Sequence, residues 1–251
     1  MLTSQRKLLL LDMLRRDGKI VAKTVAAQLG TSEDTIRRDL RELAGEGLLQ
    51  RVHGGALPSS PAMGDFAARQ QIAVDDKSAI GRAAALMIQP GQVVFIDGGT
   101  TSAQLVRHLP IDLKATVVTH SPSVAVELVA HPSIEVIMLG GRLFKHSVVG
   151  VGSATVEAIR TVRADVYFMG VCSVHPEAGL TTGDFEEAGV KRALSAAAAE
   201  TIVLASPEKL ATASPYQVIA LDALSGLVTV QSVAEELLAP YRARGISVHL
   251  A

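Results

Sequence analysis

From residue 77 onward, short apolar runs alternate with helical patterns, and this alternation constrains the fold more than any other feature of the chain. The apolar runs are QVVFID (92–97), ATVVTH (115–120), IEVIMLG (134–140), ADVYFMG (164–170), TIVLAS (201–206), QVIALD (217–222) and GLVTV (226–230). Helical patterns between them cover 78–88, 102–109, 123–130, 154–160, 184–200 and 233–238. Continuous apolar strands separated by helices predict a mostly parallel sheet covered on both faces. We therefore expect a large α/β domain over residues 77–251.

The loops that follow these apolar runs carry the candidate ligand-binding residues, because open α/β sheets bind ligands beyond the carboxyl ends of their strands. These loops are Asp97-Gly98-Gly99-Thr100-Thr101, Thr119-His120-Ser121, Gly140-Gly141-Arg142 and Gly150-Val151-Gly152-Ser153. Glycines allow close backbone approach, hydroxyls donate hydrogen bonds, and a helix N-terminus supplies free amides at the positive end of its dipole. Together these loops predict an anion site, and phosphate is the ligand that suits it best.

Other chemistries find little support in the sequence. The glycine loops lack both the Gly-Lys-Ser/Thr ending of a P-loop and the three spaced glycines of a dinucleotide fingerprint. Cys172 and His175 have a Cys-x-x-His spacing, but no second pair completes a zinc site. We expect no metal, no cofactor and no catalytic residues.

Residues 31–55, TSEDTIRRDLRELAGEGLLQRVHGG, begin with a helix that has two different faces. Thr31 is the expected N-cap, with Asp34 three residues on. At 100° per residue, an apolar stripe of Ile36, Leu40 and Leu43 is expected to pack inward. A separate face presents Arg37, Arg38 and Arg41, with Thr35 near its edge. Guanidinium groups on one helix face suit contacts with phosphates or guanine edges in a DNA major groove.

The surrounding sequence supports a winged helix-turn-helix domain over residues 1–57. Residues 23–30 form a short helical pattern that ends at Gly30, so the order is helix, tight turn and basic helix. Residues 48–52 are strand-like, and the following HGGA turn predicts a β-wing that bears Arg51 and His53. The alternative is a small helical domain whose arginines form a solvated face.

Charge and composition agree with two unlike domains. Residues 1–57 hold ten Lys/Arg against seven Asp/Glu, whereas the remainder holds 14 against 18. A basic head on an acidic body fits a nucleic-acid-binding module joined to a different kind of domain, across an expected linker and arm at residues 58–76. The single cysteine rules out an intrachain disulfide, and no signal-like or membrane-spanning stretch is found. We expect a cytoplasmic protein without a membrane partner.

The segments TIRRDLREL and GEGLLQRVHGGA closely resemble the amino-terminal signature of the DeoR family of bacterial transcriptional regulators. The remainder resembles the DeoR sensor domain, which is similar in fold to ribose-5-phosphate isomerase and binds phosphorylated sugars. The resemblance implies a homo-oligomeric repressor of a sugar or polyol operon, released from operator DNA by a sugar phosphate. The effector residues that it implies are Lys77, Asp97, Gly98, Gly99, Thr100, Thr101, Gly140, Gly141, Arg142, Glu187 with Lys191, and Lys209.

Several of these residues have an ordinary structural explanation as well. Glu187 could complete a capping box with Asp184 or form a surface pair with Lys191, Lys209 could be a solvated lysine, and Asp97 could bond loop amides. The chain also departs from the family pattern. Where the family usually has Thr-Asn-Ser, this chain has Thr119-His120-Ser121, so His120 takes the place of the asparagine. Before Lys209, Ser206 and Glu208 replace the family's usual aspartate and serine. These departures leave the identity of the effector open.

Two other functions remain open from the sequence. An isomerase-like enzyme could use Asp97, Glu187 and nearby lysines for proton transfer on a sugar phosphate. The second open function is that of a DNA-binding regulator that responds to no effector. The N-terminal 57 residues favour regulation, because an isomerase does not need them.

Overall fold

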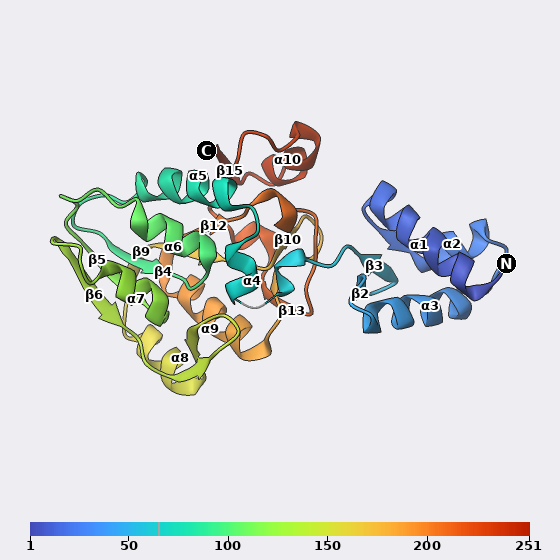
Figure 1. Ribbon diagram of the computed structural model, residues 1–251, viewed down its shortest axis with the longest axis horizontal. Coiled ribbons are helices and arrows are strands. Elements are labelled where there is room, and N and C mark those ends of the chain that lie inside the picture. Colours follow the sequence, from blue (N-terminus) through green and yellow to red (C-terminus); the bar gives the residue numbers. More distant parts are fainter. Residues whose placement is uncertain (65) are drawn as a thin grey trace.

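The computed structural model describes residues 1–64 and 66–251 and shows two domains joined by an extended segment (Figure 1). Each domain has its own hydrophobic core. The N-terminal domain consists of α1 (Thr3–Asp17), β1 (Ile20–Val21), α2 (Ala22–Gln28), α3 (Glu33–Gly45), β2 (Gln50–Val52) and β3 (Gly55–Leu57). This order confirms the expected helix-turn-helix followed by a β-wing.

Helix α3 packs through the predicted apolar stripe, since Ile36, Leu40 and Leu43 are all buried. Its N-cap is Ser32, whose side chain accepts a hydrogen bond from the Thr35 amide at 3.2 Å, so the expectation of Thr31 as the cap was wrong by one residue. Asp39 is also buried on this helix, and its carboxylate accepts two hydrogen bonds from the Arg6 guanidinium of α1. This ion pair fixes the first helix against the basic one.

The wing is a tight antiparallel hairpin. Strands β2 and β3 pair with Val52 opposite Gly55, and β1 completes a sheet of order β1-β3-β2. The two-residue turn between them contains Gly54 at φ +78°, a backbone conformation that glycine adopts without strain.

The connecting segment contains η1 (Pro61–Met63) and α4 (Phe66–Gln70), and it lies against the larger domain. The Pro58 carbonyl accepts a hydrogen bond from the Ala213 amide at 3.0 Å. The buried Ser60 hydroxyl donates to the carbonyl of Cys172. Leaving the wing, the chain is therefore bound to the larger domain before it enters α4.

Seven parallel strands in the order β15-β14-β12-β9-β4-β5-β6 form the central sheet, which confirms the expected α/β architecture. Their bounds are β4 (Val93–Ile96), β5 (Ala115–Thr119), β6 (Ile134–Met138), β9 (Ala164–Gly170), β12 (Ala198–Leu204), β14 (Gly226–Thr229) and β15 (Ser247–Leu250). Helices α5, α6 and α7 cover one face, and α8 and α9 cover the other (Figure 1). The helices are α5 (Val74–Ala85), α6 (Thr100–Arg107), α7 (Pro122–Leu128), α8 (Ser153–Arg160), α9 (Phe185–Ala196) and α10 (Glu235–Arg242).

Five short strands lie outside this sheet: β7 (Arg142–Phe144), β8 (Val149–Val151), β10 (Ser173–His175), β11 (Gly179–Thr182) and β13 (Tyr216–Ile219). Strands β7 and β8 form a hairpin, and β10, β11 and β13 form an antiparallel sheet. Two further 3₁₀ turns are η2 (Pro207–Lys209) and η3 (Leu221–Ala223).

Three details of the sequence-based expectation were wrong. The run QVIALD supplies β13 of the small antiparallel sheet, and the strand at the far edge of the main sheet is β15, which was not expected. Helix α9 ends at Ala196, because Ala198 already begins β12 and pairs with Ala164. Helix α5 begins at Val74, so the expected arm at 58–76 already contains its first turn.

Candidate functional site

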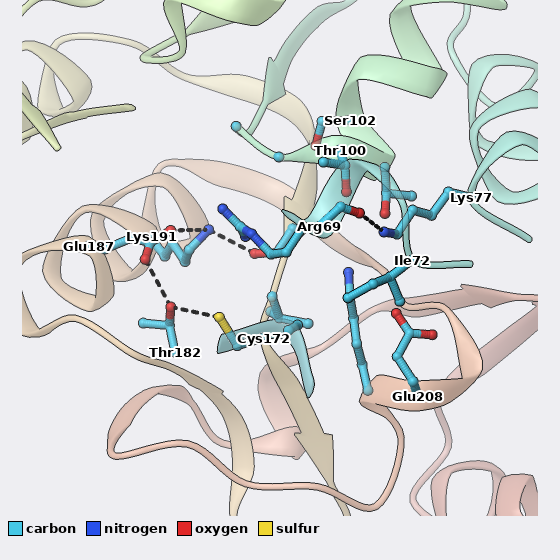
Figure 2. A pocket seen from close by; sticks show the side chains of 17 residues that line it. Arg69, Ile72, Lys77, Thr100, Ser102, Cys172, Thr182, Glu187, Lys191 and Glu208 are labelled. Carbon is cyan, nitrogen blue, oxygen red and sulfur yellow. Dashed lines mark hydrogen bonds and ion pairs between the residues drawn. The ribbon is translucent and has the colours of Figure 1, made fainter. Parts of the chain in front are cut away.

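A polar pocket opens beyond the carboxyl ends of β4, β9 and β12, with roughly 470 Å³ of empty space that includes its open mouth (Figure 2). Residues from the β4–α6 loop, α5, α9 and η2 line it, together with Ala62, Arg69 and Ile72 from the connecting segment. The structure thus brings together the predicted residues Lys77, Gly98, Gly99, Thr100, Thr101, Glu187 and Lys209.

One wall of the pocket is the N-terminus of α6. Gly98 has no room for a side chain, because a Cβ there would lie 2.2 Å from a methyl carbon of Val149. Gly99 is the N-cap at φ +132°. The hydroxyl groups of Thr101 and Ser102 are buried and have no hydrogen-bond partner among the described residues. Because buried polar groups are normally paired, these hydroxyls and the free helix amides are available to an anionic ligand.

Basic side chains from α4, α5 and η2 also line the pocket. The Lys77 ammonium group donates to the Arg69 carbonyl at 2.6 Å, and the guanidinium of Arg69 reaches the His146 carbonyl at 3.2 Å. Burial lowers the pKa of Lys77, and it lowers the pKa of Lys209 to about 8, although the Glu208 carboxylate acts in the opposite direction on both. A bound anion would stabilise the charged form of both lysines.

Asp97 lies beneath the pocket and does not line it. Its fully buried carboxylate accepts hydrogen bonds from the Gly98 amide (2.8 Å), His120 Nε2 (2.8 Å), the Tyr167 hydroxyl (2.9 Å), the Gly170 amide (3.0 Å) and the Lys191 ammonium. Burial alone would raise its pKa, but Lys191 and His120 hold the pKa well below its usual range. Asp97 therefore bonds an amide of its own loop, which is the structural alternative considered for it above, and this contact positions the loop.

Glu187 and Lys191 are buried partners on α9 rather than a surface pair. Their charged groups are 3.5 Å apart, and the Thr182 hydroxyl donates to the Glu187 carboxylate at 3.0 Å (Figure 2). One half of the capping box is present, because the Asp184 carboxylate accepts a hydrogen bond from the Glu187 amide at 2.9 Å. The Glu187 side chain does not complete the box and lines the pocket instead. Cys172, below them, is 3.4 Å from the Thr182 hydroxyl.

The other three predicted loops, residues 119–121, 140–142 and 150–153, contribute no residue to the pocket lining. Thr119 and Ser121 bond backbone carbonyl groups near the strand ends, and His120 bridges the Gly150 carbonyl and Asp97. Gly140 and Gly141 lie at the edge of the sheet, where the Gly140 carbonyl accepts from Thr155 at 2.8 Å. Arg142 is exposed and paired with Glu186. Strand order puts the third loop at the sheet edge, and side-chain direction turns the second inward, so neither lines this pocket. Their roles in ligand binding stay predictions.

Pocket residues that the sequence did not reveal come mainly from the connecting segment and the small sheet: Ala62, Arg69, Ile72, Cys172 and Thr182. No local pattern marks them, since they reach the pocket only through the tertiary fold. Glu208 also lines the pocket. The sequence marked it only as a departure from the family pattern.

The helix-turn-helix domain presents the predicted basic surface. Arg38 and Arg41 are exposed on α3 and have no ion-pair partner among the described residues. Arg37 pairs with Glu33 on the same helix at 2.7 Å, and Thr35 bonds the Ser32 hydroxyl at 2.8 Å. On the wing, Arg51 and His53 are exposed. The fold thus places cationic side chains on two adjacent elements of one domain.

Within residues 1–64 and 66–251, no three His, Cys, Asp or Glu side chains are grouped so that they could hold a metal ion. None of the helices in these ranges has the length and apolar character that a membrane crossing needs.

The buried pair of Asp97 and Lys191 yields a stability prediction. Asp97→Ala should destabilise the α/β domain by about 3–5 kcal/mol, because it leaves a buried ammonium group without its main partner. Asp97→Asn combined with Lys191→Met should cost at least about 1–2 kcal/mol less than the sum of the two single changes. Urea unfolding followed by circular dichroism at pH 7, where both groups are charged, measures these differences. The exposed pair of Arg142 and Glu186 is the control, and additive costs for the buried pair would contradict the assignment.

Comparison with known protein families covers both domains. A model of the DeoR-like helix-turn-helix domain matches residues 6–61, and a model of the DeoR C-terminal sensor domain matches residues 72–231.

Curated relatives match most of the chain. The HTH-type transcriptional regulator GlpR of Haloferax volcanii is 33% identical over 232 residues, which cover 91% of this chain and 90% of the relative. The HTH-type transcriptional repressor GlcR of Bacillus subtilis is 32% identical, with 91% and 89% covered. The glycerol-3-phosphate regulon repressor of Escherichia coli K12 is 31% identical, with 76% of each chain covered.

Solved structures resemble the chain more distantly. Ribose 5-phosphate isomerase A from Methanocaldococcus jannaschii has a TM-score of 0.41 and 18% identity, and the match covers 54% of each chain. The sorbitol operon regulator SorC from Klebsiella pneumoniae has a TM-score of 0.39 and 14% identity over 83% of this chain and 90% of that chain. The family models over residues 6–61 and 72–231 agree with the curated relatives: the chain belongs to the DeoR family of transcriptional regulators.

Proposed function

We propose that this protein is a transcriptional repressor that binds operator DNA through α3 and the wing and is released by a phosphorylated sugar. The observation that carries the proposal is the pocket at the N-terminus of α6, where two buried hydroxyls lack partners among the described residues and four basic side chains lie in the lining. The names of the relatives support it, since they include a glycerol-3-phosphate regulon repressor.

The phosphate group fits one side of this pocket. Amides at the start of α6 and the hydroxyls of Thr101 and Ser102 would donate hydrogen bonds to its oxygens, and Arg69, Lys77 and Lys209 would supply positive charge. The remaining polar lining suits the hydroxyls of a sugar. Asp97, enclosed by five donors, would hold the loop in position without touching the ligand.

The connecting segment links the pocket to the DNA-binding domain. Ala62 lines the pocket, and the Ser60 hydroxyl bonds the carbonyl of Cys172, which lines it as well. Arg69 and Ile72 reach the same pocket from α4 and the residues after it. An effector that binds two arrangements of this segment with different affinity would shift the wing and α3, and so change operator affinity.

The active form would be a homo-oligomer. Helix-turn-helix domains read paired half-sites as dimers. The edge strand β6 has one neighbour in the main sheet, and beside it Val126, Val129 and Met138 are exposed, with 70%, 82% and 52% of their surface accessible. An exposed apolar face next to an unpaired strand edge supports association with a second copy.

Operator release is the direct test. Fluorescence anisotropy would follow the full-length protein on the DNA upstream of its own transcription unit, at fixed salt, while sugar monophosphates are added one at a time. We expect one of them to weaken the complex at least about tenfold and to be recovered chemically unchanged. Tight operator binding that no phosphorylated sugar alters would favour the effector-independent regulator, and isomerised product would favour the enzyme.

The exposed arginines of α3 should carry the DNA contact. Arg38→Ala and Arg41→Ala should each either cost about 1–3 kcal/mol of operator affinity, if a base is read, or reduce the salt slope by about one, if a phosphate is contacted. Arg160→Ala is a matched control, because this arginine is exposed on the other domain and pairs with Glu157 at 2.6 Å. Unchanged operator binding in Arg37→Ala, Arg38→Ala and Arg41→Ala together would exclude α3 as the recognition helix.

The unpartnered hydroxyls separate ligand binding from folding. Thr101→Val should leave stability unchanged or raise it by about 1 kcal/mol, because it removes an unsatisfied buried group, yet it should weaken phosphate-ligand binding at least about fivefold. Thr229→Val is the control, since its hydroxyl is also buried and unpartnered but lies outside the pocket. Calorimetric titration and thermal unfolding measure the two effects. Equal ligand affinity in the two variants would remove Thr101 from the site.

A further inference from the structure

Glu208 puts an acidic side chain into a pocket whose other features attract anions. It lies in η2, directly after β12, is half-buried, and lines the pocket beside Lys77 and Lys209 (Figure 2). One oxygen of its carboxylate accepts a hydrogen bond from the Ser206 hydroxyl at 2.6 Å. Ser206 is fully buried, so it fixes the direction of this carboxylate.

The other oxygen of Glu208 is unengaged. In residues 1–64 and 66–251, no lysine or arginine nitrogen lies within 4.0 Å of this carboxylate, and no second hydrogen bond reaches it. The two other acids near the pocket differ, because Glu187 is held by Thr182 and Lys191 and Asp97 has five donors. Glu208 is therefore the acid of the described pocket lining with a free acceptor.

A fixed carboxylate with a free oxygen acts on a ligand in two ways. It accepts a hydrogen bond from a hydroxyl or ammonium group, and bonds to an ionised acceptor are stronger than neutral ones. It also repels a second negative group placed against it, at a cost that half-burial makes larger than in water. The pocket thus has a place for one phosphate at α6, and the free oxygen of Glu208 disfavours a second anion that is placed against it.

We propose that Glu208 is a specificity residue of the pocket, which selects a ligand with one phosphate and a hydrogen-bond donor facing η2, and rejects a ligand with a second anionic group there. The inference rests on the proposed function, because it takes the pocket to be an effector site. It narrows the effector class to monophosphates of polyols, sugars or amino sugars. Bisphosphates and phosphorylated sugar acids are excluded.

Two substitutions separate charge from hydrogen bonding. Both Glu208→Gln and Glu208→Ala remove the negative charge, but only glutamine keeps an acceptor oxygen of nearly the same shape. The probes are fructose 6-phosphate, fructose 1,6-bisphosphate and glucosamine 6-phosphate, titrated calorimetrically into the full-length protein. Glu186→Gln is the matched control, because this acid is exposed on α9, pairs with Arg142 and lies outside the pocket lining. Thermal unfolding midpoints confirm that each variant folds.

We expect the ratio of bisphosphate to monophosphate affinity to rise at least about tenfold in Glu208→Gln and to stay unchanged in Glu186→Gln. The monophosphate should bind Glu208→Gln at least about threefold more tightly than Glu208→Ala, which isolates the hydrogen bond from the charge. A further loss confined to glucosamine 6-phosphate in Glu208→Gln would identify an ammonium as the donor, and its absence would identify a hydroxyl.

The two proposals fail in different ways. If the wild-type protein binds monophosphates but the affinity ratio is the same in Glu208→Gln, the specificity role of Glu208 is wrong and the sensor function stands. If no sugar monophosphate of the operator-release series binds the wild-type protein, the sensor function itself is wrong, and the inference falls with it.

Discussion

The carboxylate of Asp97 holds together the part of the molecule on which the pocket depends. It lies at the end of β4, near the middle of the sheet, and its five donors come from its own loop, from His120 after β5, from Tyr167 and Gly170 of β9, and from Lys191 of α9. Burying an isolated carboxylate would be very costly, but an ion pair supplemented by hydrogen bonds offsets that cost. Two strands, one helix and the β4–α6 loop are thereby fixed around one charge.

This arrangement explains why the β4–α6 loop lines the pocket and the loop after β5 does not. Asp97 draws His120 inward, so the loop after β5 supports the site from below and does not line it. The same carboxylate accepts from the Gly98 amide, which sets the path of the chain into α6. The open amides and the hydroxyls of Thr101 and Ser102 then face the pocket while their carboxylate neighbour stays hidden.

The sequence predicted the parts of the structure that local pattern determines. Apolar runs identified six of the seven strands of the main sheet, and helix periodicity identified the packed and exposed faces of α3. It could not predict strand order, which places Arg142 beyond an edge strand, where it pairs with Glu186 and does not line the pocket. Nor could it predict that Glu187 and Lys191, an ordinary i, i+4 pair by spacing, would be buried together. Arg69 and Ile72 could not be predicted as pocket residues, because the connecting segment has no hydrophobic periodicity that indicates which of its side chains face the larger domain.

The pocket contains a desolvated lysine and unpaired buried hydroxyls, and a bound anion of suitable size would stabilise both. Burial lowers the pKa of Lys209 to about 8, and two buried pocket hydroxyls have no partner among the described residues, so the free protein is less stable than a fully paired core would be. A ligand that supplies these missing partners gains affinity from them. Under the proposed function, its influence on DNA would depend on contact with Ala62 and Arg69, whose segment connects directly to the wing. Arg69 would then serve both affinity and release, whereas Glu208 lines the pocket from outside the connecting segment. A change at Glu208 would therefore alter the choice of effector and leave the proposed link to the wing in place.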